Sequence, residues 1–312
     1  MAPIDPIAAL WRSEAPLDNQ CVSSGQAVGS ASLMNFSIVG WLSALSLIEP
    51  LVALAWQVAF ARAAGFSLPW SRHALLFLSL WLVYSADHWL DARHTPPHAF
   101  QTCRHRFAAT YQKSLLATWC VALVGSLALA SCVLRPREWT AGLVLIASTL
   151  AYLVLVHRFR RGLGFRAFAK AVWVAGLFAA GSSLFIWANQ PLAPQLWVAV
   201  GLFFLLAWLN LTVIAERERS IDCTHGTTSI AHCIRHIDRL SRALAATVIS
   251  SATFAWFTWP AQGALFGSLA TCAFALVLHR RWSQHLQHER AHVISDLILL
   301  LPAGPCLLGW IG

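Results

Sequence analysis

Charged residues are scarce in this chain. They make up 11% of the 312 residues, whereas 58% are apolar, and soluble domains carry about 25% charged residues. Several apolar runs approach or exceed about 18 residues, the length that spans a membrane. No long polar linker divides these runs. The composition therefore excludes an ordinary soluble protein and predicts one polytopic, all-α membrane bundle.

Lysine is almost missing, although the chain is basic. Lys113 and Lys170 are the only lysines among 22 basic residues, and the net charge is +9. On a soluble protein this charge would suggest nucleic acid, but in a membrane protein it indicates topology and an anionic ligand. Arginine favours planar, bidentate contact with phosphate or carboxylate. A genome that prefers arginine codons is the alternative explanation.

Two further patterns are missing. The eight cysteines form no CxxC pair, so we expect no disulfide framework and interpret those in apolar runs as small hydrophobic residues. The N-terminal stretch lacks the basic start and apolar centre of a signal peptide. We expect residues 1–35 to form a flexible or interfacial arm and residues 36–312 to form the membrane domain.

The apolar runs predict nine spans. They cover residues 38–61, 73–91, 113–133, 139–157, 167–188, 194–215, 241–259, 263–280 and 293–311. Pro50 is expected to kink the first span, and Glu49 beside it is a buried acid that needs a partner.

Basic residues are unevenly divided between the loops. Those after the odd-numbered spans contain only Arg62, Arg72, Arg135 and Arg137, whereas most other basic residues flank the even-numbered loops. The positive-inside rule then places the N-terminus and the even loops in the cytoplasm. The even loops are also the long, polar ones. We therefore expect function at the cytoplasmic face, and we expect the membrane to be a bacterial inner membrane.

An acidic pair closes the second span. Asp87 and Asp91 lie in the stretch 84–91, which follows the apolar run 74–83. Because they are four residues apart, they share one face of a helix. Acids near membrane depth are costly and usually point into a bundle or a wet cavity.

A second acidic pair follows the sixth span. Glu218 and Asp222 are again four residues apart at the end of an apolar helix. The two pairs are offset by four spans, which suggests a duplicated four-helix unit followed by a ninth helix. Ion pairing of these acids with neighbouring arginines is the structural alternative.

Four carboxylates on two facing helix ends suit one chemistry. Hard oxygen ligands favour Mg²⁺, whose shell is often completed by substrate phosphates. A metal-bound diphosphate is a good leaving group, and additional cations would balance its charge. The candidate cations are Arg93, Arg104, Arg106, Arg158, Arg160, Arg161 and Lys170. The aromatic side chains that could shield an allylic cation behind them are Trp89, Tyr152, Trp173 and Trp208.

With these two motifs and nine predicted spans, the chain resembles the UbiA-type intramembrane prenyltransferase superfamily. That family's first motif has the form NDxxDxxxD. Asp87 and Asp91 match its last two acids, whereas Val83 and Tyr84 replace its leading Asn and Asp. The resemblance implies that one metal ligand is missing. We expect Tyr84→Asp to tighten Mg²⁺ binding without abolishing activity.

The family's second motif has the form DxxxDxxxGxxS/T. Glu218, Asp222, Gly226 and Ser229 match it in order, with Glu in place of the first Asp. The resemblance implies a nine-helix bundle in which both acidic pairs bind Mg²⁺, while Ser229 and the cations bind an isoprenyl diphosphate. The implied reaction is prenyl transfer to an aromatic or lipid acceptor within the membrane, without nucleic acid.

Other interpretations remain open from the sequence. A terpene cyclase of the same family would capture the cation within its own prenyl chain, and a non-catalytic lipid-binding protein would keep only the fold. His285, His288 and His292 have helical spacing but form no recognised zinc signature. Asp296 is expected to make a hydrogen-bonded helix contact.

Overall fold

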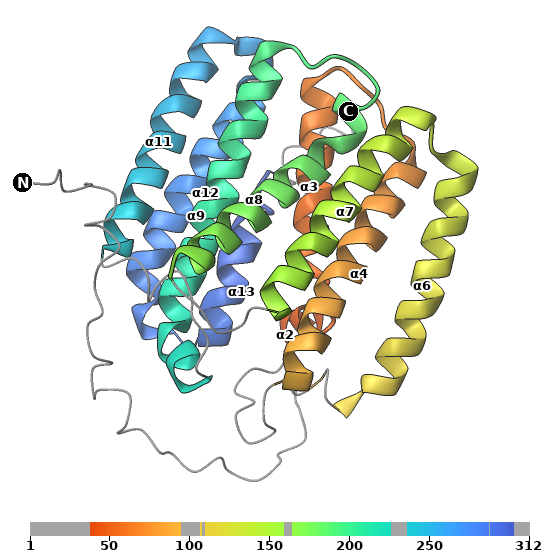
Figure 1. Cartoon of the computed structure of the whole chain (residues 1–312). Helices are drawn as coiled ribbons and strands as arrows, with labels where there is room; N and C mark the ends of the chain where they lie inside the picture. Colours follow the sequence, from red (N-terminus) through yellow and green to blue (C-terminus); the bar gives the residue numbers. More distant parts are fainter. Residues whose placement is uncertain are drawn as a thin grey trace, which may run out of the picture.

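The computed structural model describes residues 38–94, 107, 110–158, 164–225, 236–286 and 288–302. Within these ranges the chain is all helical, as predicted (Figure 1). The α-helices are α2 (Ile38–Ala44), α3 (Ile48–Ala63), α4 (Trp70–His94), α6 (Gln112–Val133), α7 (Pro136–Arg158), α8 (Gly164–Trp187), α9 (Pro194–His225), α11 (Ile237–Thr258), α12 (Gly263–Trp282) and α13 (His288–Ile298). Two short 3₁₀ helices, Pro260–Gln262 and Ser283–His285, flank α12.

Each of the nine predicted spans overlaps helical structure, the ninth only at residues 293–298, and the described residues include six helices that are long and apolar enough to cross a membrane. These are α6, α7, α8, α9, α11 and α12. At about 1.5 Å per residue, the 16 residues of α3 and the 11 residues of α13 are shorter than a bilayer core of about 30 Å. The chain is a multi-pass membrane protein, and the nine-span count stays a prediction.

The first predicted span is broken rather than kinked. Ser46 has a φ of 54° between α2 and α3. Pro50 lies in the first turn of α3, where the N–H that proline lacks is not needed. The expected kink at Pro50 is therefore wrong, because the helix has already ended upstream of it. Ser46 Oγ lies 2.7 Å from His88 Nδ1, and Trp81 Nε1 donates to the carbonyl of Leu45 at 2.9 Å. Both contacts hold the break against α4.

The core of the bundle is built on α3 and α9. Helix α9 packs against α8, α11, α12 and α13, and α3 packs against α4, α8 and α13. Trp56 of α3 is fully buried and stacks on Phe203 of α9 with ring centroids 4.4 Å apart. Its Nε1 donates to the carbonyl of Leu299, just after α13, at 3.0 Å. Such packing and interhelical hydrogen bonds hold membrane helices together, because lipid tails are as apolar as the side chains.

Helix α6 lies at one edge of the bundle in Figure 1, with α4 between it and α7. Only 11% of the α6 span and 17% of the α7 span is buried. Val121, Val124 and Val144 are among their exposed apolar side chains. Since exposed apolar faces on helices of this length fit lipid contact, we interpret this edge as facing the bilayer.

The helices alternate in direction, so the bundle has two ends. We call the end at which α4, α7, α9 and α12 finish the motif end (Figure 1). At the opposite end, the side chain of Glu138 in the first turn of α7 is 1% exposed. Its carboxylate accepts hydrogen bonds from the backbone of Arg135 at 2.8 Å, Asn189 Nδ2 at 2.8 Å and Arg72 Nη2 at 3.2 Å. It therefore ties together the start of α4, the α6–α7 turn and the residues after α8.

Candidate functional site

The two acidic pairs lie on helices that finish at the motif end (Figure 1). Helix α9 has 32 residues and is about 48 Å long at 1.5 Å per residue. Its apolar span ends at Arg217, so residues 218–225 continue the helix beyond the span. The sixth span was predicted to end at residue 215. The helix continues to His225, so Glu218 and Asp222 lie on it, at the end of an apolar helix as expected.

The acidic face of α4 points into the bundle. Helical period places Tyr84, Asp87 and Asp91 within about 60° of one another around the helix axis. Tyr84 interacts electrostatically with Glu49 of α3, Tyr152 of α7 and Asp296 of α13, as well as with Asp87. Because these partners come from helices on different sides, the face that carries the first motif is directed inward.

Tyr84 and the four residues with which it interacts electrostatically are called the interior polar cluster here: Glu49, Tyr84, Asp87, Tyr152 and Asp296. Four helices contribute to it. Glu49, Tyr84 and Asp87 are only half-buried, although they lie among packed helices. Sequence analysis marked Glu49 and Asp296 as buried acids but did not bring them to Tyr84. The sequence signal that could have brought these residues together is the acid inside each apolar span, because such acids usually face the interior of a helix bundle.

The interior polar cluster changes what Tyr84→Asp should do. The substitution adds a carboxylate beside Glu49, Asp87 and Asp296, and like charges away from water repel strongly. Without divalent cations we expect the free energy of unfolding to fall by about 1–3 kcal/mol, a typical range for one destabilising substitution. Mg²⁺ should restore much of this loss. Denaturation in detergent, with EDTA or with Mg²⁺, measures it.

Tyr84→Phe is the matched control, because it keeps the ring and adds no charge. Its stability should not respond to Mg²⁺ more than that of the unmodified chain. A Tyr84→Asp protein that is equally stable with EDTA and with Mg²⁺ would contradict the expectation of tighter metal binding.

Asp296 makes the hydrogen-bonded helix contact predicted for it. Asn210 Nδ2 of α9 donates to Asp296 Oδ1 at 2.9 Å, and His292 Nε2 lies 3.7 Å from Asp296 Oδ2. Both Asn210 and Asp296 are buried. Asn210 Oδ1 is buried too, without a hydrogen-bond partner in the described part of the chain. The contact joins α9, which carries the second motif, to the interior polar cluster.

A separate ion pair occupies the opposite side of α9. Arg280 of α12 contacts both carboxylate oxygens of Glu216, at 2.6 and 2.9 Å, and Arg217 Nη2 donates to the carbonyl of Arg280 at 2.5 Å. Positions 218 and 222 lie about 200° and 240° around the axis from Glu216. They lie on the same face of α9 as Leu211. On one side of this face Asn210 contacts α13, and on the other side Trp208 contacts Phe168 of α8.

The structure describes the other predicted site residues to different extents. Lys170 is exposed near the start of α8, at the motif end. The helices carry five further residues at this end, whose side chains lie outside the described part of the structure: Asp91, Arg93, Arg158, Glu218 and Asp222. Five residues lie wholly outside it: Arg104, Arg106, Arg160, Arg161 and Ser229.

The Mg²⁺ site stays a prediction. Among the described residues, no three His, Cys, Asp or Glu side chains are arranged to hold a metal ion. Asp87 is the one predicted ligand whose side chain is described. The predicted donors are all carboxylates, which match the preference of Mg²⁺ for hard oxygen ligands.

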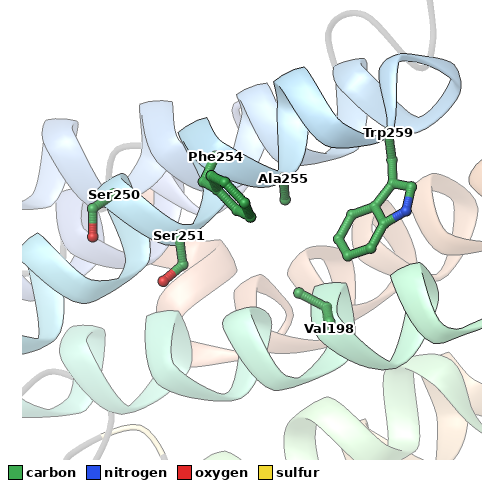
Figure 2. Close-up of a pocket in the computed structure, with 6 residues that line it drawn as sticks. All are labelled: Val198, Ser250, Ser251, Phe254, Ala255 and Trp259. Carbon is green, nitrogen blue, oxygen red and sulfur yellow. The ribbon is translucent and has the colours of Figure 1, made fainter.

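An apolar groove lies between α9 and α11, away from the acids. It has a volume of about 450 Å³, and Figure 2 shows its lining residues on the two helices, among them Val198, Phe254 and Trp259. None of the described residues that line it has an ionisable side chain. Val198 is 20 residues before Glu218, or about 30 Å along α9 at 1.5 Å per residue. Phe254 is 72% exposed, so we interpret the groove as a lipid-facing surface rather than the reaction site.

Comparisons with known proteins do not place the chain in a family. No family model, curated protein or solved structure matches it. The resemblance to prenyltransferases therefore rests on the two motifs and on the predicted layout of the spans.

Proposed function

We propose that the chain is an intramembrane prenyltransferase that uses Mg²⁺ to ionise an isoprenyl diphosphate and passes the prenyl group to a lipophilic acceptor. The observation that carries the proposal is the placement of the acidic pairs. Helices α4 and α9 finish at the same end of one bundle, and the acidic face of α4 is directed inward, toward Tyr152 and Asp296.

The carboxylates would hold Mg²⁺ between the two helix ends. Asp87 and Asp91 would bind from α4, and Glu218 and Asp222 from α9. Two ions would offset the four negative charges and leave coordination positions for phosphate oxygens. Bound there, Mg²⁺ supplies positive charge to the diphosphate as it leaves.

Cations at the motif end would bind the diphosphate. The exposed Lys170 lies near the start of α8, at the same end as both acidic pairs. The arginine-rich loops that follow α4 and α7 add guanidinium groups, which bind phosphate oxygens in a bidentate manner. These groups orient the diphosphate toward the acids and leave the prenyl chain to enter the apolar bundle.

Tyr152 is an aromatic member of the interior polar cluster, beside which the prenyl cation would form. The rings of Tyr152 and Trp173 are 6.5 Å apart between centroids, and Phe168 packs edge-on against Trp208 at 5.2 Å. Ring faces stabilise cations, so these side chains would shield the allylic carbon from water. In the reaction, the C–O bond to diphosphate breaks, the acceptor bonds to the allylic carbon, and the acceptor loses a proton.

The direct test is diphosphate release by the full chain in proteoliposomes. With geranylgeranyl diphosphate as the probe, we expect release in Mg²⁺ and none in EDTA. The same incubation without acceptor should form no cyclic product. A cyclic hydrocarbon would assign the chain as a cyclase, and tight diphosphate binding without release would assign it as a lipid-binding protein. Neither binding nor release would contradict the proposal altogether.

A further inference from the structure

A small basic cavity lies at the motif end, where α9, α11 and α12 pack against one another. Three arginines line it, Arg242 of α11 and both Arg280 and Arg281 of α12. We propose that this cavity binds the phosphate of an anionic phospholipid from the surrounding leaflet. A lipid bound there is distinct from the substrate of the proposed function and does not depend on it.

The cavity is on the side of α9 that faces away from the second acidic pair. Leu209 and Val213 are the residues of α9 that line it, and both lie within about 60° of Glu216 around the helix axis. Positions 218 and 222 lie on the opposite side of the helix, as described above. The arginines of the cavity are therefore separated by α9 from the proposed metal site.

The three arginines are positioned by acids, but their charge is not fully balanced. Arg242 Nη2 lies 2.7 Å from Asp238 Oδ2, and Arg280 contacts both carboxylate oxygens of Glu216. Arg281 is exposed, and its guanidinium makes no hydrogen bond or ion pair with the described residues. Two acids thus face three arginines, and one positive charge remains to attract an anion.

The size of the cavity limits what can enter it. Its volume is about 30 Å³, which is room for about two water-sized atoms. One or two phosphate oxygens fit, whereas a whole diphosphate or nucleotide does not. Guanidinium groups bind phosphate oxygens in a bidentate manner. The remaining atoms of the ligand must then lie outside the cavity, against the surface of the helices.

The surface beside Arg281 is suited to acyl chains. Phe274 and Leu278 of α12 are exposed and lie within about 60° of Arg281 around the helix axis. They form an apolar strip that leads along α12 to the arginine. Trp282, the last residue of α12, is also exposed, and tryptophan is enriched at the level of lipid headgroups. The strip, the tryptophan and the arginines match the acyl chains, the interface and the phosphate of a phospholipid.

The depth of the cavity in the membrane favours a lipid over a free anion. The apolar spans of α9, α11 and α12 have their motif-end limits at Arg217, Ile237 and Trp282, so the cavity lies where the spans meet the headgroups. Basic pockets between membrane helices at this level bind anionic headgroups. A free phosphate would contact only the arginines, whereas a phospholipid would also contact the apolar strip.

The test measures the affinity of the purified full chain for phosphatidylglycerol, by native mass spectrometry from detergent that contains EDTA. In Arg281→Gln we expect about fivefold weaker binding, the effect of one arginine near a membrane surface. Arg281→Lys keeps the charge, and its affinity should stay within about twofold of the unmodified value, because lysine also binds phosphate.

Arg290→Gln is the matched control. Arg290 is an exposed arginine of α13 at the same end of the bundle, and it does not line the cavity. Its substitution changes the net charge by the same amount as Arg281→Gln. The affinity of Arg290→Gln for phosphatidylglycerol should equal that of the unmodified chain.

Competitors identify the bound molecule. Inorganic phosphate supplies the anion without acyl chains, and dioleoylglycerol supplies the chains without phosphate. Neither should displace phosphatidylglycerol at equal concentration, because each makes only part of the contacts. Phosphatidylcholine, which has no net charge, should bind more weakly than phosphatidylglycerol.

Three results would overturn the proposal. The first is equal affinity of Arg281→Gln and the unmodified chain. The second is an equal loss in Arg281→Gln and Arg290→Gln, which would reflect net charge rather than the cavity. The third is displacement by inorganic phosphate, which would assign the cavity to a free anion. The assay contains neither Mg²⁺ nor prenyl diphosphate, so failure of the proposed function would leave its result unaffected.

Discussion

Asp87→Asn and Asp222→Asn should each slow Mg²⁺-dependent diphosphate release by at least about 100-fold, the scale on which losing one group that stabilises developing charge slows an enzyme. Asparagine keeps the shape of aspartate but removes the charge that would hold Mg²⁺. Asp87 lies on the inward face of α4, and position 222 lies on the continuation of α9 beyond its apolar span. The two substitutions therefore test both sides of the proposed metal site.

Release is measured in proteoliposomes at saturating geranylgeranyl diphosphate, over a series of Mg²⁺ concentrations. Asp238→Asn is the matched control, because Asp238 is an acid in the first turn of α11, at the same end of the bundle, but its side chain is 45% exposed and pairs with Arg242. Its release rate should stay within about twofold of the unmodified rate, because exposed ion pairs contribute little. Unchanged release in both Asp87→Asn and Asp222→Asn would rule out the assignment.

Glu138→Ala should lower the free energy of unfolding by about 3–5 kcal/mol, the usual cost of breaking a buried ion pair from one side. The Glu138 side chain is 1% exposed, and its substitution by alanine removes the carboxylate to which both Arg72 and Asn189 donate. It also frees the backbone N–H of Arg135 at the α6–α7 turn. Three segments at the end opposite the motifs would lose their common contact.

Unfolding by sodium dodecyl sulfate in mixed micelles, followed by tryptophan fluorescence, measures the loss. Glu138→Gln should lose less, because its amide oxygen still accepts two of the bonds. The double variant Arg72→Met with Glu138→Leu should recover part of the stability, since apolar side chains of similar volume can replace a buried pair. A Glu138→Ala protein within about 0.5 kcal/mol of the unmodified chain, the range of ordinary surface substitutions, would contradict this account of the contact.

The helices were predictable from the sequence because apolar runs of span length carry a strong signal. The positions at which the helices end were less predictable. The break at Ser46 depends on a single left-handed residue, and nothing in the apolar pattern of residues 38–61 marks it. The kink predicted at Pro50 is wrong, because proline in the first turn of a helix is tolerated rather than disruptive.

The candidate site was predictable only where local spacing decides it. Asp87 and Asp91 share a face because they are four residues apart, and the electrostatic partners of Tyr84 lie on α3, α7 and α13 as well as on α4. The contact of Asp296 with Asn210 is tertiary, since the two residues lie on different helices and are 86 positions apart in the sequence. Glu138 was missed for the same reason. Its partners are Arg72, at the start of α4, and Asn189, which follows α8, and no local pattern connects the three.

The most direct measurement is the binding of Mn²⁺, a paramagnetic substitute for Mg²⁺, to the purified full chain in the presence of inorganic diphosphate. Electron paramagnetic resonance gives the amount of free ion and therefore the bound fraction. The account predicts saturable binding in the unmodified chain and in Asp238→Asn, and at least about tenfold weaker binding in both Asp87→Asn and Asp222→Asn, consistent with the loss of one ligand. Equal Mn²⁺ affinity in all four proteins would contradict a metal site shared between α4 and α9.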